Sequence, residues 1–111
     1  MAALNVEAFR TLGPHDQVRN DAVVPFYLED LKRRVSVARV DYSLYAFDDL
    51  CTCAEPACPL SGGLLEGATI LCQCHGSRFD VTCGAVVSGP ATRPLNVYEV
   101  SEVGNDIRIH I

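Results

Sequence analysis

The most informative segment of the chain reads Cys72-Gln-Cys-His-Gly-Ser-Arg-Phe-Asp80. An earlier segment is also rich in cysteine: it begins Cys51-Thr-Cys53, continues through Ala-Glu-Pro-Ala, and ends in Cys58-Pro-Leu-Ser-Gly-Gly63. Of the six cysteines, five lie in these two segments, and His75 follows the last of the five. Thiolates are soft ligands that bind both iron–sulfur clusters and zinc. Two cysteine-bearing loops of this kind therefore predict a metal site.

Short segments on both sides of these loops have the residue pattern of β-strands. Residues 35–40 alternate, residues 41–43 are expected to turn the chain, and residues 44–47 return as the second strand of a hairpin. Further strands are predicted, with Gly and Pro between them, at 64–71, 78–81, 85–87, 96–100 and 107–111. Short strands at this spacing predict an all-β domain, either a small antiparallel sandwich or a partly open barrel.

Length and composition limit the possible functions. A chain of 111 residues forms about one domain, and 49% hydrophobic with 21% charged residues is typical of a folded protein. The net charge of −5 argues against nucleic acid or an anionic membrane as the main partner and favours a basic protein. The sequence has neither an apolar run of the ~20 residues that a membrane span needs nor a signal-peptide pattern. We therefore expect a cytoplasmic protein, in which clustered cysteines indicate metal ligands.

The two loops resemble those of the Rieske [2Fe–2S] proteins, whose signature is Cys-x-His, a spacer, and then Cys-x-x-His-Gly. The matching words are Cys51-Thr52, residues 58–63, residues 72–80 and Gly89-Pro-Ala91. The resemblance covers residues 23–111. It implies a Rieske-like all-β sandwich or barrel with a cluster-binding subdomain of two loops at about 48–91. Residues 1–22 carry only a weak helical pattern and are expected to form an N-terminal segment that is extended or becomes ordered on docking.

The resemblance also implies a ligand set. In the family, one Cys from each loop binds one iron and one His from each loop binds the other. Carried over to this chain, Cys51 and Cys72 are expected on the inner iron and His75 on the outer iron. Cys53 stands where the family has its first histidine; it is the expected fourth ligand, with Cys58 as the alternative. A thiolate in place of an imidazole adds negative charge, so we expect a reduction potential between the four-Cys type (about −400 mV) and the Rieske range (about −150 to +300 mV).

Other loop residues have counterparts in the family. Cys58 and Cys74 correspond to the cysteines that form a disulfide between the ligand loops of quinol-oxidising members, and two free thiols are the alternative. Ser77 matches a serine whose hydroxyl can donate to a cluster sulfide, whereas Phe79 replaces the tyrosine of high-potential members and has no hydroxyl. The segment that begins Gly89-Pro90 resembles the proline loop that covers the cluster. Three loop glycines are expected to adopt positive φ: Gly62, Gly63 and Gly76.

The function implied by the resemblance is that of a Rieske-type ferredoxin. Such a protein carries one electron on a [2Fe–2S] cluster from a flavin-dependent reductase to a terminal oxygenase or similar oxidoreductase. We expect an electron-transfer component with no catalytic residues of its own. The chain has only His15 and His110 beyond the site, too few ligands for the separate catalytic iron of an oxygenase. The alternative is a cluster-free or zinc-binding module for thiol redox sensing or interaction on a Rieske fold.

Two charged runs are open to more than one interpretation. Lys32-Arg33-Arg34 opens a predicted strand and is either a solvated face or a docking site. Asp48-Asp49 leads into the first cysteine loop and consists either of turn residues or of part of an acidic docking face. The sequence leaves both pairs of alternatives open.

Overall fold

The computed structural model describes residues 9–52 and 58–111, and this part of the chain contains strands and two 3₁₀ turns but no α-helix. The strands are β1 (Phe9–Pro14), β2 (Val23–Leu28), β3 (Arg33–Val40), β4 (Ser43–Asp48), β5 (Leu64–Glu66), β6 (Thr69–Leu71), β7 (Arg78–Asp80), β8 (Val86–Ser88), β9 (Val97–Val103) and β10 (Asp106–His110). The 3₁₀ turns are η1 (His15–Gln17) and η2 (Leu60–Gly62). Within the described ranges, no helix has the length and apolar character to cross a bilayer. The predicted all-β class is confirmed.

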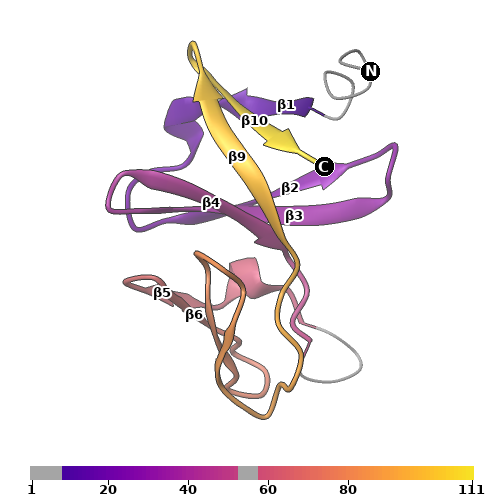
Figure 1. Cartoon of the computed structure of the whole chain (residues 1–111), viewed down its shortest axis with the longest axis vertical. Helices are drawn as coiled ribbons and strands as arrows, with labels where there is room; N and C mark the ends of the chain where they lie inside the picture. The colour runs from indigo at the N-terminus through magenta and orange to yellow at the C-terminus, as the bar shows by residue number, and fades with distance from the viewer. Residues whose placement is uncertain (1–8, 53–57) are drawn as a thin grey trace.

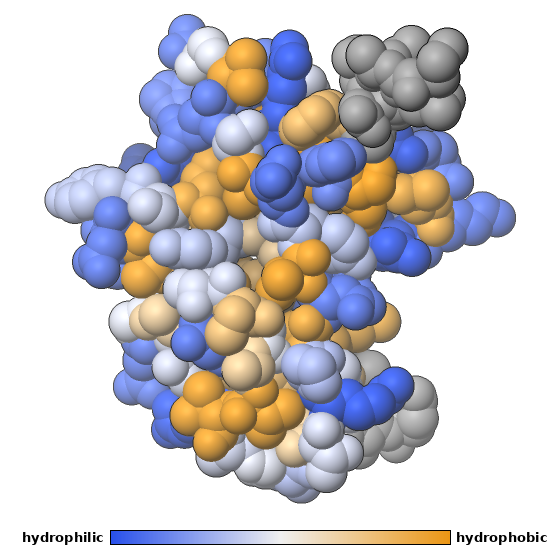
Figure 2. All heavy atoms as spheres, in the orientation of Figure 1, coloured by the Kyte–Doolittle hydropathy of each residue, from blue (hydrophilic) through white to orange (hydrophobic). Residues whose placement is uncertain are grey.

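The strands form two antiparallel sheets (Figure 1). The larger sheet has the order β1-β10-β9-β4-β3-β2, and the smaller sheet has the order β5-β6-β7-β8. The smaller sheet and the described parts of both cysteine loops lie at one end of the molecule, the lower end in Figure 1, where a patch of hydrophobic residues is exposed (Figure 2). The chain enters this end after β4 and leaves it before β9, so the whole cysteine-rich region is an insertion between two neighbouring strands of the larger sheet.

The β3–β4 hairpin forms where the sequence predicts it. Val40 pairs with Ser43, so Asp41 and Tyr42 are the two central residues of the turn. Both have positive φ, 50° and 68°, as a two-residue type I′ turn requires. Such a turn matches the twist of the flanking strands, which fixes the register that brings β4 to the first cysteine loop.

The prediction of one strand over residues 64–71 is wrong. The segment forms two strands, β5 and β6, which pair with each other through Leu64 and Leu71 at one end and Glu66 and Thr69 at the other. Gly67 lies in the tight turn between them with a φ of +59°. The run is apolar on both sides of this glycine, and apolar character alone does not distinguish one buried strand from a short hairpin.

The segment before β2 contributes to the larger sheet. From Phe9 to Pro14 it forms β1, which pairs with β10 along its length apart from a shift in register between Thr11 and Gly13. Val18, just after η1, is almost fully buried. From residue 9 onward, this part of the chain is therefore ordered by pairing with the C-terminal strand, which no local pattern in residues 1–22 indicates.

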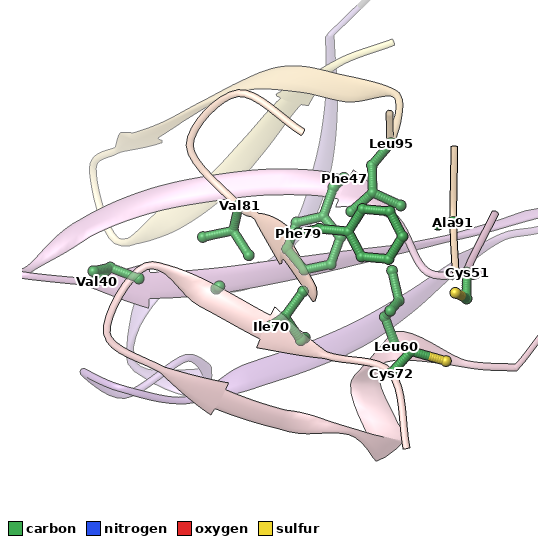
Figure 3. Close-up of a cluster of buried hydrophobic side chains, with 11 residues drawn as sticks. Val40, Phe47, Cys51, Leu60, Ile70, Cys72, Phe79, Val81, Ala91 and Leu95 are labelled. Carbon is green, nitrogen blue, oxygen red and sulfur yellow. The ribbon is translucent and has the colours of Figure 1, made fainter. Parts of the chain in front are cut away.

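Two apolar clusters stabilise the fold. The first is formed by side chains of the larger sheet and includes Val35 and Val37 of β3 and Ile107 and Ile109 of β10. The second connects the two sheets and consists of Ala38, Val40, Phe47, Cys51, Leu60, Ile70, Cys72, Phe79, Val81, Ala91 and Leu95 (Figure 3). This second cluster, named the inter-sheet core below, holds the cysteine loops against the larger sheet by burial of apolar surface.

Candidate metal centre

The first cysteine loop closes on itself directly after β4. Leu50 and Pro59 form an isolated antiparallel bridge, and the Cys51 amide donates to the Cys58 carbonyl over 2.9 Å. The loop is thereby pinched at its base, and Cys51 is buried there, with 3% of its surface exposed. Cys53, the expected fourth ligand, belongs to the segment 53–57, which is outside the described residues.

The second cysteine loop connects β6 and β7 by a tight turn. The Cys72 amide donates to the Ser77 carbonyl over 2.8 Å, and the Gly76 amide donates to the Cys72 carbonyl over 2.9 Å. Gly76 has a φ of +80°, a conformation that a side chain disfavours, and this confirms the expectation for that glycine. Cys72 at the base of the loop is fully buried, whereas His75 near its tip is exposed.

The two buried cysteines share an apolar floor. Figure 3 shows the sulfur atoms of Cys51 and Cys72 at the same end of the inter-sheet core, next to Leu60. Phe79 lies behind them and is fully buried, with no hydroxyl that could donate toward a sulfur. The floor keeps water away from this side of the site, which strengthens electrostatic interactions there.

A disulfide between Cys58 and Cys74 joins the two loops, with a Cα–Cα distance of 6.4 Å. This is the pair that the family resemblance implies. A third segment is attached through Ser77, whose buried hydroxyl oxygen accepts a hydrogen bond of 2.9 Å from the Ala91 amide. That bond uses the oxygen as an acceptor and leaves the hydroxyl proton for a second partner. Three chain segments thus converge around the buried sulfurs.

Asp49 fixes the first loop to the larger sheet. Its carboxylate is fully buried and forms an ion pair with Arg34 of β3. It also accepts hydrogen bonds from the Ser36 hydroxyl (2.6 Å), the Ser61 amide (2.7 Å) and the Ser61 hydroxyl (3.1 Å). The interpretation of Asp49 as a turn residue or part of an acidic docking face is wrong, because this side chain is an internal link between β3 and η2.

The neighbouring Asp48 has a different role. It accepts hydrogen bonds from the Tyr98 hydroxyl over 2.6 Å and from the Asn96 amide group over 2.9 Å. The pKa of Tyr98 is raised to about 12, first by burial and second by the hydrogen bond to Asp48. Arg33, which donates to the same hydroxyl, has a smaller effect in the opposite direction. The phenol therefore stays protonated at neutral pH and joins β4 to β9 where the chain enters and leaves the cysteine-rich region.

Gly63 is required for a close approach of two backbones. A Cβ atom at this position would lie 2.0 Å from the Leu71 carbonyl oxygen. Its φ is −88°, and Gly62 is likewise outside the positive region, so the expectation of positive φ at these two glycines is wrong. The absence of a side chain, rather than an unusual φ, lets the first loop pack against the end of β6.

The residues present fit a cluster held by sulfur and nitrogen. Two buried sulfurs over an apolar floor and an exposed imidazole are soft and borderline donors, the types that iron–sulfur centres use. Among residues 9–52 and 58–111, no three His, Cys, Asp or Glu side chains already form a group that could hold a metal ion. The fourth expected donor, Cys53, is outside these ranges.

A family model described as the Rieske [2Fe–2S] domain matches residues 9–99. The chain belongs to this family. As a Rieske-type ferredoxin it is a one-electron carrier, and its cofactor is a [2Fe–2S] cluster. The match begins at the first residue of β1 and thus includes the strand that the sequence left outside the domain.

Several known proteins of similar sequence and structure are ferredoxins. The ferredoxin component of a naphthalene 1,2-dioxygenase system from Pseudomonas aeruginosa is 34% identical over 79 residues, which cover 71% of this chain and 74% of the relative. The ferredoxin of carbazole 1,9a-dioxygenase from Nocardioides aromaticivorans superimposes with a TM-score of 0.81 at 27% identity, over 92% of this chain and 96% of the other. A structure of reduced oxygenase in complex with oxidised ferredoxin in carbazole 1,9a-dioxygenase contains a chain with a TM-score of 0.82 at 27% identity, with 93% of both chains covered.

Proposed function

We propose that this Rieske-type ferredoxin accepts one electron from a flavin-dependent reductase and passes it to a terminal oxygenase. The observation that carries the proposal is the exposed His75 at the tip of a loop whose base holds the buried Cys72. A carrier needs one ligand at the surface for exchange with its partners and an interior that excludes water on the other side. The similarity to ferredoxin components of dioxygenase systems supports the same partners.

The proposed ligands are Cys51 and Cys72 for the inner iron and Cys53 and His75 for the outer iron. The family pattern supports Cys53 as the fourth ligand, because Cys53 stands where the signature has its first histidine, and Cys58 is the alternative. When bound, the [2Fe–2S] cluster supplies reversible exchange of one electron.

The residues around the ligands position them and set the local polarity. The disulfide restrains both loops, and the link from Asp49 to Ser61 holds the first loop against β3. The Ser77 hydroxyl has its proton available for a sulfur atom, and hydrogen bonds to sulfur raise the reduction potential. The thiolate of Cys53 acts in the opposite direction, because it adds one negative charge to the ligand set. We propose a potential between about −400 mV and the Rieske range that begins at about −150 mV.

The ligand set is tested on protein purified without oxygen, by assays for iron, acid-labile sulfide and zinc and by EPR after reduction with dithionite. We expect about two irons and two sulfides per chain. Cys53→Ala is expected to abolish the signal, Cys53→His to give Rieske-like g values and a higher potential, and Cys58→Ala, the control, to keep the cluster. Zinc without sulfide would support the alternative of a thiol redox-sensing or interaction module, and loss of the cluster in Cys58→Ala alone would assign that cysteine as the ligand.

The partners are tested by replacing the ferredoxin component in a reconstituted naphthalene 1,2-dioxygenase system with this chain. We expect reduction of the chain by the flavin reductase of that system and reoxidation by its terminal oxygenase. A chain that holds the cluster but exchanges electrons with neither protein would contradict the proposed partners. The cytoplasmic location expected from the sequence belongs to the same proposal and is tested by cell fractionation.

A further inference from the structure

A groove of about 500 Å³ lies beside the first cysteine loop. One wall is the connection between β2 and β3, with Leu31, Lys32 and Arg33. The other wall combines residues next to Cys51 with Arg93 from the segment before β9. Because Cys51 itself lines the groove, a molecule bound there lies directly against a proposed ligand loop.

The groove is basic although the chain is acidic. Of the nine Lys and Arg residues, four line it (Lys32, Arg33, Arg34 and Arg93), whereas Asp48 is the only one of the fourteen Asp and Glu residues that does so among those described. The rest of the surface therefore carries the excess of negative charge. An anionic group that approaches the molecule is attracted at this groove and repelled elsewhere.

Two of these cations have no other role among the described residues. Arg34 forms the ion pair with Asp49, and Arg33 donates to the Tyr98 hydroxyl. Lys32 and Arg93 are exposed and form neither an ion pair nor a side-chain hydrogen bond with any residue that the structure describes. They are available to bind an external carboxylate.

Hydrogen bonds to backbone carbonyls hold the walls of the groove. The Thr52 hydroxyl donates to the Arg93 carbonyl over 2.6 Å and joins two of its segments. Lys32 lies in the β2–β3 turn with a φ of +50°, where its amide donates to the Glu29 carbonyl over 3.3 Å. The turn thereby places a cation in the wall of the groove.

Exposed apolar side chains accompany the cations. Leu31 and Leu50, both in the groove lining, are 40% and 49% exposed. A site for a small anion gains nothing from exposed leucines, whereas a protein interface combines apolar contact with charged groups at its rim. The chemistry of the groove thus fits a polypeptide segment that carries both carboxylates and apolar side chains.

We propose that this groove docks an acidic segment of a redox partner and thereby aligns the partner with the first cysteine loop. The inference deepens the proposed function, on which it rests, by naming the chemistry of the partner's contact surface. The net charge of −5 alone favours a basic partner, but the groove attracts acidic groups locally. Attraction at one place and repulsion at the others orient the partner during encounter.

The test follows oxidation of the reduced, cluster-bound protein by ferricyanide in a stopped-flow instrument at several ionic strengths. Ferricyanide is an anion, so the net charge alone predicts a rate constant that rises with salt as repulsion is screened. The groove predicts a rate constant that falls with salt. In the double variant Lys32→Glu/Arg93→Glu, the rate constant at low ionic strength is expected to fall about tenfold and its salt dependence to reverse.

The matched control is Arg19→Glu/Arg108→Glu, which has the same net charge as the groove variant. Arg19 and Arg108 are exposed, line no part of the groove and form no side-chain bond to described residues. We expect the control to retain the salt dependence of the unmodified chain. If both double variants lower the rate constant equally, the net charge governs the reaction and the groove proposal is wrong.

A hexaglutamate peptide distinguishes a docking surface from a site for small anions. It is expected to slow the ferricyanide reaction of the unmodified chain and of the control, but not that of the groove variant. Slowing of the same size by inorganic phosphate at equal ionic strength would overturn the docking proposal. Iron, sulfide and EPR are measured on the same samples, so loss of the cluster, which overturns the proposed function, is distinguished from loss of the groove.

Discussion

Replacement of the buried Asp49 by asparagine tests whether this carboxylate holds the metal-binding end to the larger sheet. The carboxylate is fully buried and contacts Arg34 and Ser36 on β3 and Ser61 on η2. Asparagine has nearly the same shape, and its one carbonyl oxygen can still accept from Ser36 and from the Ser61 amide. Its amide group, however, is a donor and faces the Ser61 hydroxyl and the Arg34 guanidinium, which are donors in the unmodified protein.

The expected cost is about 3 kcal/mol. Breaking a fully buried ion pair costs about 3–5 kcal/mol, whereas an exposed pair contributes up to about 1 kcal/mol. The Arg34 side chain is 41% exposed, so water can solvate part of its charge, which places the pair at the lower end of the buried range. The loss of one hydrogen bond to a charged acceptor, about 1.5–3 kcal/mol, gives the same magnitude.

The assay is thermal unfolding of the cluster-bound protein, followed by circular dichroism and by visible absorbance at one fixed heating rate. For a chain of this length, 3 kcal/mol corresponds to a decrease of about 12 °C in Tm. Asp106→Asn is the control, since it makes the same chemical change at an exposed position with no side-chain partner among the described residues. We expect it to change the stability by less than about 0.5 kcal/mol. A Tm for Asp49→Asn within 2 °C of the control, about 0.5 kcal/mol, would refute the reasoning.

Three further predictions concern Tyr98, Gly63 and the disulfide between Cys58 and Cys74. The pKa of Tyr98 is raised to about 12 from 10.0, so its contribution to stability is complete below pH 10 and is lost as the pH rises through 12. Between these pH values, the free energy of unfolding measured in urea should fall more steeply in the unmodified protein than in Tyr98→Phe, with the tyrosinate absorbance reporting the ionisation. Parallel curves for the two proteins would contradict this prediction. Gly63→Ala places a Cβ 2.0 Å from a backbone oxygen and should lower the free energy of unfolding by more than about 2 kcal/mol, whereas Gly62→Ala meets only a flexible side-chain end at 3.1 Å and should cost less than about 1 kcal/mol; equal costs would show that the backbones separate easily. Cys58→Ser/Cys74→Ser removes a disulfide with a sequence separation of 16, and the greater entropy of the unfolded chain should lower the free energy of unfolding by about 3 kcal/mol. We expect the variant to lose its visible absorbance faster in urea. An unchanged rate would mean that the ligands alone hold the loops.

Local sequence was sufficient for much of the fold. The hairpin of β3 and β4 depends on alternation and on a two-residue turn, both of which are encoded within residues 33–48. The short hairpin of β5 and β6 was missed, because its two strands and its turn lie in one apolar run where only Gly67 marks the break. Strand β1 was missed for a different reason: its partner, β10, lies at the other end of the chain.

In the candidate site, too, some features are encoded in local sequence and others depend on contacts between distant segments. The cysteine-rich words identify the family because the ligands and the residues beside them are contiguous in sequence, and a short segment therefore carries the chemistry. Asp49 could not be assigned in this way. An aspartate beside another aspartate at the end of a strand has the pattern of a solvated turn, and only the approach of Arg34, Ser36 and Ser61 compensates the cost of burying its charge.

The sequence by itself determined the all-β class, the two cysteine loops and the kind of cofactor, because strand alternation and ligand spacing are properties of short segments. Only the tertiary structure decided which charges are internal links and which are available to partners. The basic groove brings together residues near 32, 51 and 93, and no window of the sequence contains all three. A chain with a net charge of −5 can therefore carry a locally positive surface, since Coulomb interactions depend on distance in space and are screened within about 10 Å by salt.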